Sequence, residues 1–333
     1  MRRPKLRAAL VAALLGFVFA GTALAGDNAG FTPVEPHSPN AQRITDAYYL
    51  ILGLTGGVFV IVEGALLLFV FRFRRGRRSR QAEGPQIRGN TSLEIAWTVV
   101  PVLILAVIAA FVFYKLPGIE DVPTARAAET LPIRIQAHQY YWEFVYPDGQ
   151  IAINRMAVPS GRVVRLEVVS ADVAHSWWIP ALGGKIDAIP GRTNHTWFRT
   201  PAEPGVFQGQ CAELCGIEHA SMRAAVEVVP DAKYRSFLAT HSPGSATVGR
   251  ETFTGVCATC HGLAGEGDIG RALAGNATLN DETAVRLVLE EGLRSGLKLM
   301  PAVGSDWPEA QTRAVIAYLQ KNLAPAKGVP SGG

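Results

Sequence analysis

The sequence predicts a chain of several domains: a two-helix membrane hairpin, then a β-sandwich or barrel, then a small all-α domain. Three observations predict this order. Two long apolar segments near the N-terminus are separated by an arginine-rich segment, residues of 131–229 alternate between apolar and polar, and helical periodicity returns after residue 249. A length of 333 residues also favours more than one domain.

The first 25 residues have the pattern of a signal peptide. A positively charged start precedes an apolar run from Ala8 to Ala20, and Ala23-Leu24-Ala25 is a small-residue cleavage motif. The apolar run is short for a membrane span, so we predict removal after Ala25 and a location of the later domains outside the cytoplasm. Residues 26–40, rich in Pro, Gly and Asn, are predicted to form an extended lead.

Residues 26–116 are predicted to contain the lead and a transmembrane hairpin, with helices at about 46–71 and 95–114. The loop 72–93 begins with six arginines in nine residues, which indicates a cytoplasmic loop by the positive-inside rule. Both ends of the hairpin then face the exterior. Glu94 stands where the second span begins, and a carboxylate there is favoured by the helix dipole. The net charge of +4 is explained by arginines beside the spans, so no nucleic-acid partner is predicted.

Residues 117–229 form the predicted β domain, after a Pro/Ala-rich stretch at 117–130. Ile133 and Ile135 alternate with polar residues, and Pro147-Asp148-Gly149 is a turn signal. Met156 is predicted to lie in the core of this domain. His138 and His195 are predicted to be hydrogen-bonded histidines rather than ligands, because neither lies in a metal motif.

A stretch of twelve residues, 211–222, carries a cluster of soft and borderline metal ligands. It contains Cys211, Cys215, His219 and Met222, and the segment Asp172-Val-Ala-His175 supplies a second histidine. Thiolate, imidazole and thioether ligands together favour copper over magnesium or calcium. A Cys211–Cys215 disulfide needs neither histidine nor methionine, and zinc sites rarely include methionine. A pair of copper ions fits this ligand set better than one ion.

The linker at 230–248 is predicted to contain a short helix and then a flexible stretch from His241 onward. Residues 249–325 then open with a c-type haem attachment motif, Cys257-Ala-Thr-Cys260-His261. A thioredoxin-like CxxC is the alternative, but the following histidine and the lack of a βαβ pattern disfavour it. Met300, about 40 residues later, is predicted to be the sixth iron ligand, as in the similar small class I cytochromes c. Asp306 is predicted to cap a helix, and residues 326–333 to form a disordered tail.

The motifs LEIAWTVVP, DVAHSWWIPALGGKIDAIPGR and QCAELCGIEHASM resemble subunit II of the haem–copper cytochrome c oxidases over about residues 40–230. The resemblance implies a cupredoxin-like fold for the β domain and the binuclear copper centre called CuA. It implies these copper ligands: His175, Cys211, Cys215, His219, Met222 and the backbone carbonyl of Glu213.

The resemblance also implies roles for residues outside the copper ligand set. The Glu213 carboxylate is expected to bind a magnesium shared with the catalytic subunit, Asp187 to lie near it, and Glu94 to lie near a proton-uptake path. In the aromatic group formed by Tyr140, Tyr141 and Trp142, Tyr140 replaces the tryptophan at which electrons usually enter, which puts the usual route in doubt.

The implied function is electron transfer in the bacterial inner membrane, from haem c to CuA and on to a separate subunit I that reduces oxygen and pumps protons. The expected partners are the other oxidase subunits and a donor such as a cytochrome c or a bc complex. A quinol oxidase subunit would lack the copper ligands, and a nitrous-oxide reductase would lack the hairpin. A CuA subunit of a nitric-oxide reductase and a non-enzymatic copper-delivery protein remain alternatives.

Overall fold

The computed structural model describes residues 32–73, 86–122, 130–295 and 298–325. The predicted signal peptide, most of the arginine-rich loop and the predicted tail at 326–333 lie outside the described residues. The chain divides into two compact units, one formed by residues 42–121 and the other by residues up to 41 together with those from 122 onward.

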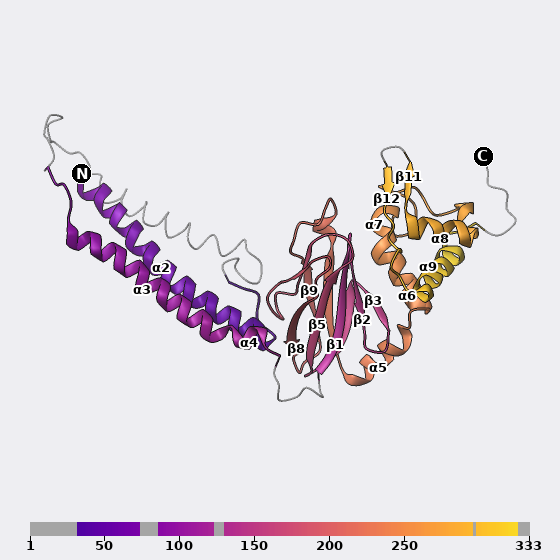
Figure 1. Cartoon of the computed structure of the whole chain (residues 1–333), viewed down its shortest axis with the longest axis horizontal. Coiled ribbons are helices and arrows are strands. Elements are labelled where there is room, and N and C mark those ends of the chain that lie inside the picture. The colour runs from indigo at the N-terminus through magenta and orange to yellow at the C-terminus, as the bar shows by residue number, and fades with distance from the viewer. Residues whose placement is uncertain (1–31, 74–85, 123–129, 296–297, 326–333) are drawn as a thin grey trace, which may run out of the picture. The chain divides into compact units, whose positions relative to one another are not determined.

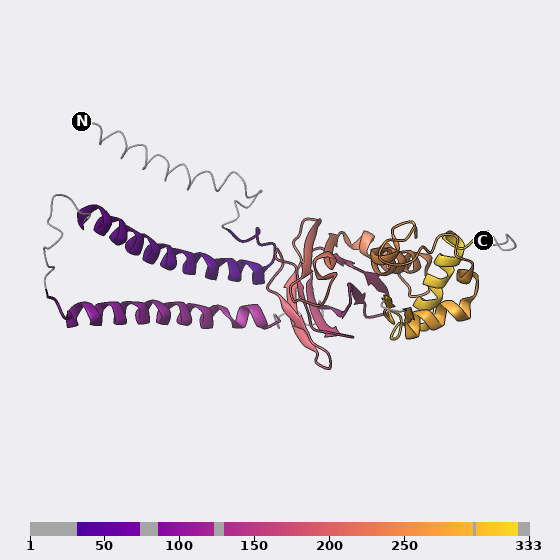
Figure 2. The same cartoon turned by 90° about the horizontal axis from the view of Figure 1, so that it is seen from above.

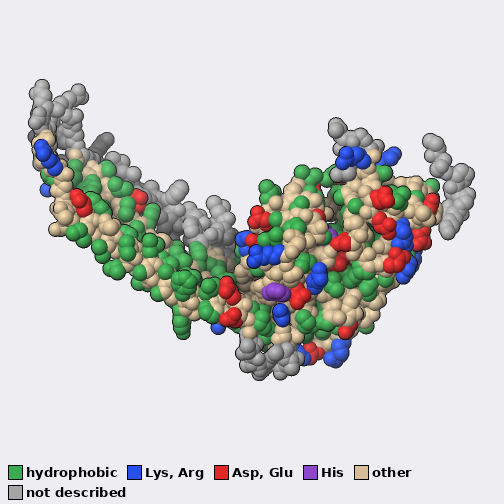
Figure 3. Space-filling model, in the orientation of Figure 1, with side chains coloured by type: hydrophobic (Ala, Val, Ile, Leu, Met, Phe, Trp, Pro, Cys, Tyr) green, Lys and Arg blue, Asp and Glu red, His purple; other side chains and the backbone are tan. Residues whose placement is uncertain are grey.

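The unit of residues 42–121 is a helical hairpin with apolar surfaces. Helix α2 spans Pro39–Phe73, α3 spans Thr91–Lys115, and the short α4 spans Pro117–Glu120. Among the described residues, Pro39–Phe73 and Thr91–Glu120 are long and apolar enough to cross a membrane, and Figure 3 shows hydrophobic side chains along both. The ends of α2 and α3 meet through Lys115 Nζ, which lies 2.7 Å from Asp46 Oδ2.

The β domain consists of two sheets packed face to face (Figure 1). One sheet has the strand order β3-β2-β1-β5-β8 and the other β4-β10-β9-β6-β7. Neighbouring strands are antiparallel except for the pairs β1–β5 and β4–β10. The strands are β1 Thr130–His138, β2 Tyr141–Val145, β3 Ile151–Ile153, β4 Arg155–Pro159, β5 Val163–Ser170, β6 His175–Trp178, β7 Ile186–Ala188, β8 Asn194–Arg199, β9 Gly205–Cys211 and β10 Arg223–Val229.

The core of the β domain follows from the alternation in the sequence. Ile133, Ile135 and Trp142 point between the sheets and are fully buried, together with Met156, as predicted. The polar partners of these residues on β1 and β2 therefore lie on the outer face of the first sheet. The predicted β-sandwich is confirmed.

The C-terminal domain is mainly helical around a second apolar core. Its elements are α6 Ala246–Thr252, the π-helical turn η4 Phe253–Cys257, α7 Ala258–His261, η5 Ala277–Asn280, α8 Glu282–Glu291, the hairpin strands β11 Leu293–Ser295 and β12 Lys298–Met300, and α9 Glu309–Asn322. The predicted cap of the last helix is wrong: α9 begins after Pro308, and the Asp306 carboxylate instead accepts a hydrogen bond from Gln136 on β1.

The segment 230–248 contains the predicted short helix, while the stretch after it that was predicted to be flexible includes only residues 241–245 before α6 begins. Helix α5 spans Asp231–Thr240, and its Tyr234 and Phe237 rings contact Tyr146 of the β domain. The carbonyl of His241 then accepts a hydrogen bond of 2.9 Å from the Ile151 amide on β3. Apolar side chains of this helix thus hold the first half of the linker against the β domain.

The C-terminal domain packs on the outer face of the β3-β2-β1 edge, where the views in Figures 1 and 2 agree. Tyr141, Ile151 and Ile153 of the β domain belong to the same buried cluster as Phe253, Cys257 and Trp307 of the C-terminal domain. The two domains are therefore joined by a continuous apolar interface.

Candidate metal centre

The segment 211–222, called the cysteine-rich loop below, connects strands β9 and β10 of the second sheet. Cys211 ends β9, Met222 directly precedes β10, and the Cys211 amide donates to the Met222 carbonyl at 2.9 Å. His175 begins β6, which pairs with β9 next to Cys211. Strand pairing therefore brings the distant histidine to the two ends of the loop.

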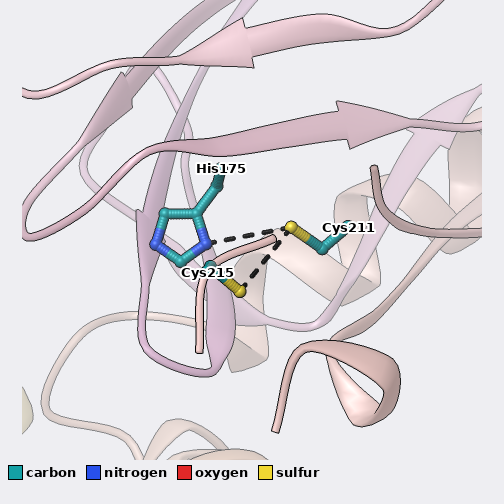
Figure 4. Close-up of side chains that lie close together, drawn as sticks. All are labelled: His175, Cys211 and Cys215. Atoms are coloured by element: carbon teal, nitrogen blue, oxygen red, sulfur yellow. Dashed lines mark hydrogen bonds between the residues drawn. The ribbon is translucent and has the colours of Figure 1, made fainter. Parts of the chain in front are cut away.

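The five side chains predicted as copper ligands converge at this end of the sheet. Figure 4 shows His175 and the two cysteines, with His175 Nδ1 3.9 Å from Cys211 Sγ and the two Sγ atoms 3.9 Å apart. Cys215 Sγ also lies 3.6 Å from His219 Nδ1 and 3.9 Å from Met222 Sδ. A disulfide has an S–S distance of about 2.05 Å, so both thiols are free.

A carboxylate orients the buried histidine. His175 Nε2 lies 2.8 Å from Asp172 Oδ1, which leaves Nδ1 directed toward the sulfur atoms. The other carboxylate oxygen of Asp172 accepts a hydrogen bond of 2.6 Å from the Gln139 amide. Such outer carboxylates fix the orientation of a histidine ligand, a role that the sequence motif did not reveal for Asp172.

The two thiols differ in acidity. Burial opposes ionisation of Cys211, but its hydrogen bonds, of which the one with His175 has the largest effect, together outweigh burial and lower the pKa of Cys211 to about 6. Burial and then the charge of Cys211 raise the pKa of Cys215 to about 12. One thiolate is therefore available near neutral pH, while the second requires a bound cation to lose its proton.

The remaining predicted residues of this region lie close to the loop. The Glu213 carbonyl is 3.2 Å from Cys211 Sγ, while the Glu213 side chain is exposed. Asp187 on β7 accepts hydrogen bonds of 2.8 Å from Ser176 Oγ and Lys185 Nζ. Ser176 directly follows His175, so Asp187 is hydrogen-bonded to the neighbour of a predicted copper ligand.

The aromatic residues predicted for electron transfer contact the same centre. Tyr140 Oη accepts a hydrogen bond of 3.2 Å from the Ile217 amide in the loop. Trp142 is fully buried, with its ring centroid 6.0 Å from that of His175. Glu94 lies in the other unit, where its carboxylate accepts a hydrogen bond of 3.3 Å from the Asn90 amide at the start of α3.

His138 has no role in the cluster. It is buried on β1 and stacks on Tyr141, with ring centroids 4.4 Å apart. Its Nε2 atom has no hydrogen-bond partner among the described residues, so the predicted hydrogen bonding is not seen at that atom, and Asp306 Oδ2 is 3.9 Å away.

The haem attachment motif lies on η4 and α7 of the C-terminal domain. Cys257 is buried and Cys260 half-buried, and His261 Nδ1 donates a hydrogen bond of 2.7 Å to the Arg271 carbonyl. This bond leaves His261 Nε2 available to an iron ion. Met300 is half-buried at the end of β12 and packs against the apolar core of the domain. These donors fit a covalently attached haem.

Three family models match successive parts of the chain. Residues 28–114 match the transmembrane domain of cytochrome c oxidase subunit II, and residues 150–229 match its periplasmic domain. Residues 244–319 match cytochrome c oxidase, cbb3-type, subunit III.

Individual relatives agree with these matches. Cytochrome c oxidase subunit 2 of Alkalihalophilus pseudofirmus is 33% identical over 316 residues, covering 87% of this chain and 90% of the relative. A probable cytochrome c oxidase subunit 2 of Rickettsia bellii is 33% identical, covering 65% of this chain and 85% of the relative. A solved structure of the periplasmic domain of subunit II of cytochrome oxidase from Bradyrhizobium japonicum is 40% identical and covers 36% of this chain and 96% of that domain, with a TM-score of 0.34.

The fold and the site define a membrane protein whose β domain carries a buried Cys/His/Met cluster and whose C-terminal domain carries a haem attachment motif. The chain belongs to the cytochrome c oxidase subunit II family and has a cytochrome c domain at its C-terminal end.

Proposed function

We propose that this chain carries electrons into a respiratory oxidase, receiving them at its C-terminal domain and delivering them through its β domain to a separate catalytic subunit. That subunit reduces oxygen to water and pumps protons. The observation that supports this most is the convergence of two free thiols, two imidazole Nδ1 atoms and a thioether at one end of the second sheet.

The protein side chains have distinct tasks in this proposal. His175, Cys211, Cys215, His219 and Met222 hold a binuclear copper centre, with the Glu213 carbonyl as a further donor. Cys257 and Cys260 would attach haem c covalently, and His261 and Met300 would bind its iron. When bound, the copper pair and the haem each supply reversible one-electron chemistry. The chain orients these ligands, as the hydrogen bond between Asp172 and His175 illustrates.

The partners and location belong to the same proposal. Both soluble domains lie on the periplasmic side of the bacterial inner membrane, with a cytochrome c or a bc complex as donor. The exposed Glu213 carboxylate is available to a magnesium shared with subunit I. Glu94 at the start of α3 lies near the proton-uptake path of that subunit, and Tyr140 and Trp142 lie on the electron route.

The test of the copper centre is the electron paramagnetic resonance spectrum of the purified full-length protein. We expect the hyperfine pattern of one unpaired electron shared by two copper nuclei, with equal haem and copper-pair content. The pattern of a single copper would contradict the proposal and favour a copper-delivery protein. Oxygen consumption by the native complex, with nitric oxide as the competing substrate, separates an oxidase from a nitric-oxide reductase.

A further inference from the structure

The side chain of Tyr141 connects the two domains through its hydroxyl group. Trp307 Nε1 donates a hydrogen bond of 2.8 Å to Tyr141 Oη, and this hydroxyl donates to the Val303 carbonyl at 3.3 Å. The Tyr141 side chain is almost fully buried, and its ring stacks on His138. One tyrosine of the β domain is therefore bonded twice to the C-terminal domain.

The segment bonded to Tyr141 is the one that follows Met300. Val303 is three residues after this methionine, and Trp307 ends the same loop before α9. The loop is also held from its own domain, since the Gly304 amide donates to the Leu289 carbonyl at 2.9 Å. The position of the loop thus depends on both domains.

On its other side, Tyr141 is joined to the metal centre. The next residue, Trp142, points to the opposite face of β2 and packs edge-on against His175. Asn154 makes a parallel connection: its Oδ1 accepts from the Trp142 amide at 2.9 Å, and its Nδ2 donates to the Gly255 carbonyl at 3.1 Å. Gly255 lies two residues before Cys257.

We propose that Tyr141 is a positioning residue that holds the Met300–Trp307 loop of the cytochrome domain in a fixed place against the strand carrying Trp142. Its hydroxyl sets both the order of the loop and the separation of the two redox sites. This inference rests on the proposed function, because it assigns Met300 and His175 to those sites. It places the main connection at Tyr141 rather than at Tyr140, whose hydroxyl contacts only the cysteine-rich loop among the described residues.

The test is Tyr141→Phe in the full-length protein, which removes the hydroxyl and keeps the ring on His138. Tyr146→Phe is the matched control, because the Tyr146 hydroxyl also makes two hydrogen bonds, both of 2.9 Å to Ala157 inside the β domain. The measurements are amide hydrogen exchange of residues 302–307, the absorption band of methionine-ligated ferric haem, and the interdomain transfer rate after flash reduction of the haem.

In Tyr141→Phe we expect exchange of the loop amides to increase roughly tenfold. Each of the two lost hydrogen bonds should raise the equilibrium constant for local opening of the loop by a factor of a few. The methionine band should weaken and the transfer rate should fall, while the copper spectrum stays unchanged. Tyr146→Phe should leave all of these at wild-type values. If loop exchange and interdomain transfer in Tyr141→Phe equal those of the wild-type protein, the inference about Tyr141 is overturned and the proposed function is not. If the wild-type protein itself binds no copper pair or no haem, the proposed function is overturned as well.

Discussion

At the scale of single residues, Glu143 is the most unusual group outside the metal centre. Its carboxylate is buried under the cytochrome domain, where Gln311 Nε2 donates to it at 3.0 Å. Burial, with the charge of Asp306 as a further cause, raises the pKa of Glu143 to about 7. Gln311 Oε1 has no partner among the described residues, and a protonated Glu143 would supply one.

We expect docking of the cytochrome domain to weaken as the pH rises. The pKa of Glu143 is higher in the docked state than the ordinary value of about 4.3, so its stabilising effect is complete below that value and is lost as the pH rises through about 7. Between pH 6 and 8 the loss amounts to about 1 kcal/mol. The protection of strand β3 amides from hydrogen exchange, compared between pH 6 and pH 8, measures this loss of docking free energy.

Glu143→Gln should remove most of this pH dependence. The control Glu227→Gln changes a carboxylate that is paired with Arg155 on the second sheet, and the pH dependence of docking should remain in this variant. Docking that is equally strong at pH 6 and pH 8 in the wild-type protein would contradict the assignment to Glu143.

At the scale of elements, the turn η4 fits closely against strand β3. A Cβ atom added at Gly255 would lie 2.6 Å from Ile153 Cγ2 and 2.8 Å from Asn154 Nδ2. Alanine generally stabilises a helix by about 1 kcal/mol relative to glycine. The glycine here therefore serves the contact between the domains rather than the local helix.

Gly255→Ala should loosen the docked arrangement by about 1–3 kcal/mol, the usual cost of overpacking, without altering haem attachment. Spin labels on exposed sites of the two domains would report a broader distance distribution. Gly244→Ala is the control, because its added Cβ would lie 3.8 Å from the nearest heavy atom outside its own segment. An unchanged distribution in Gly255→Ala would contradict the close fit between η4 and β3 that is assigned to this glycine.

Local sequence signals predicted the fold class and the side chains that converge at the end of β9, because most of them lie in short motifs. The segment 211–222 is a short motif between two strands, whereas the hydrogen bond between Asp172 and His175 did not follow from that motif. The place of Asp306 was not predictable in this way. It precedes a proline and a helix, as a cap would, yet its partner Gln136 is 170 residues away on another domain.

At the scale of the whole molecule, the connection between the domains is short and ordered. Helix α5 packs on the β domain, and Ser245 caps α6 by accepting from the Val248 amide at 3.2 Å. The flexible tether inferred from composition was wrong because Tyr234 and Phe237 find an apolar partner in Tyr146, which no local pattern reveals.

Inserting ten Gly/Ser residues between Pro243 and Gly244 should therefore leave interdomain electron transfer within about twofold of wild type. Lengthening a loop costs only about 0.6 kcal/mol per doubling, which the interface can absorb. Flash reduction of the haem measures the rate. A rate that falls steeply with insert length would mean that a tether rather than the interface brings the domains together.

The covered face of the β domain also restricts which electron donors can bind to this domain in the proposed function. Tyr141, Ile151 and Ile153 lie beneath the protein's own cytochrome domain, so this surface is closed to any competitor in solution. Under the proposed function, a soluble carrier would have to use another face of the β domain or give its electrons to the attached domain. The attached cytochrome domain thus occupies this face permanently, and an external donor would be selected by the outer surface of residues 246–325.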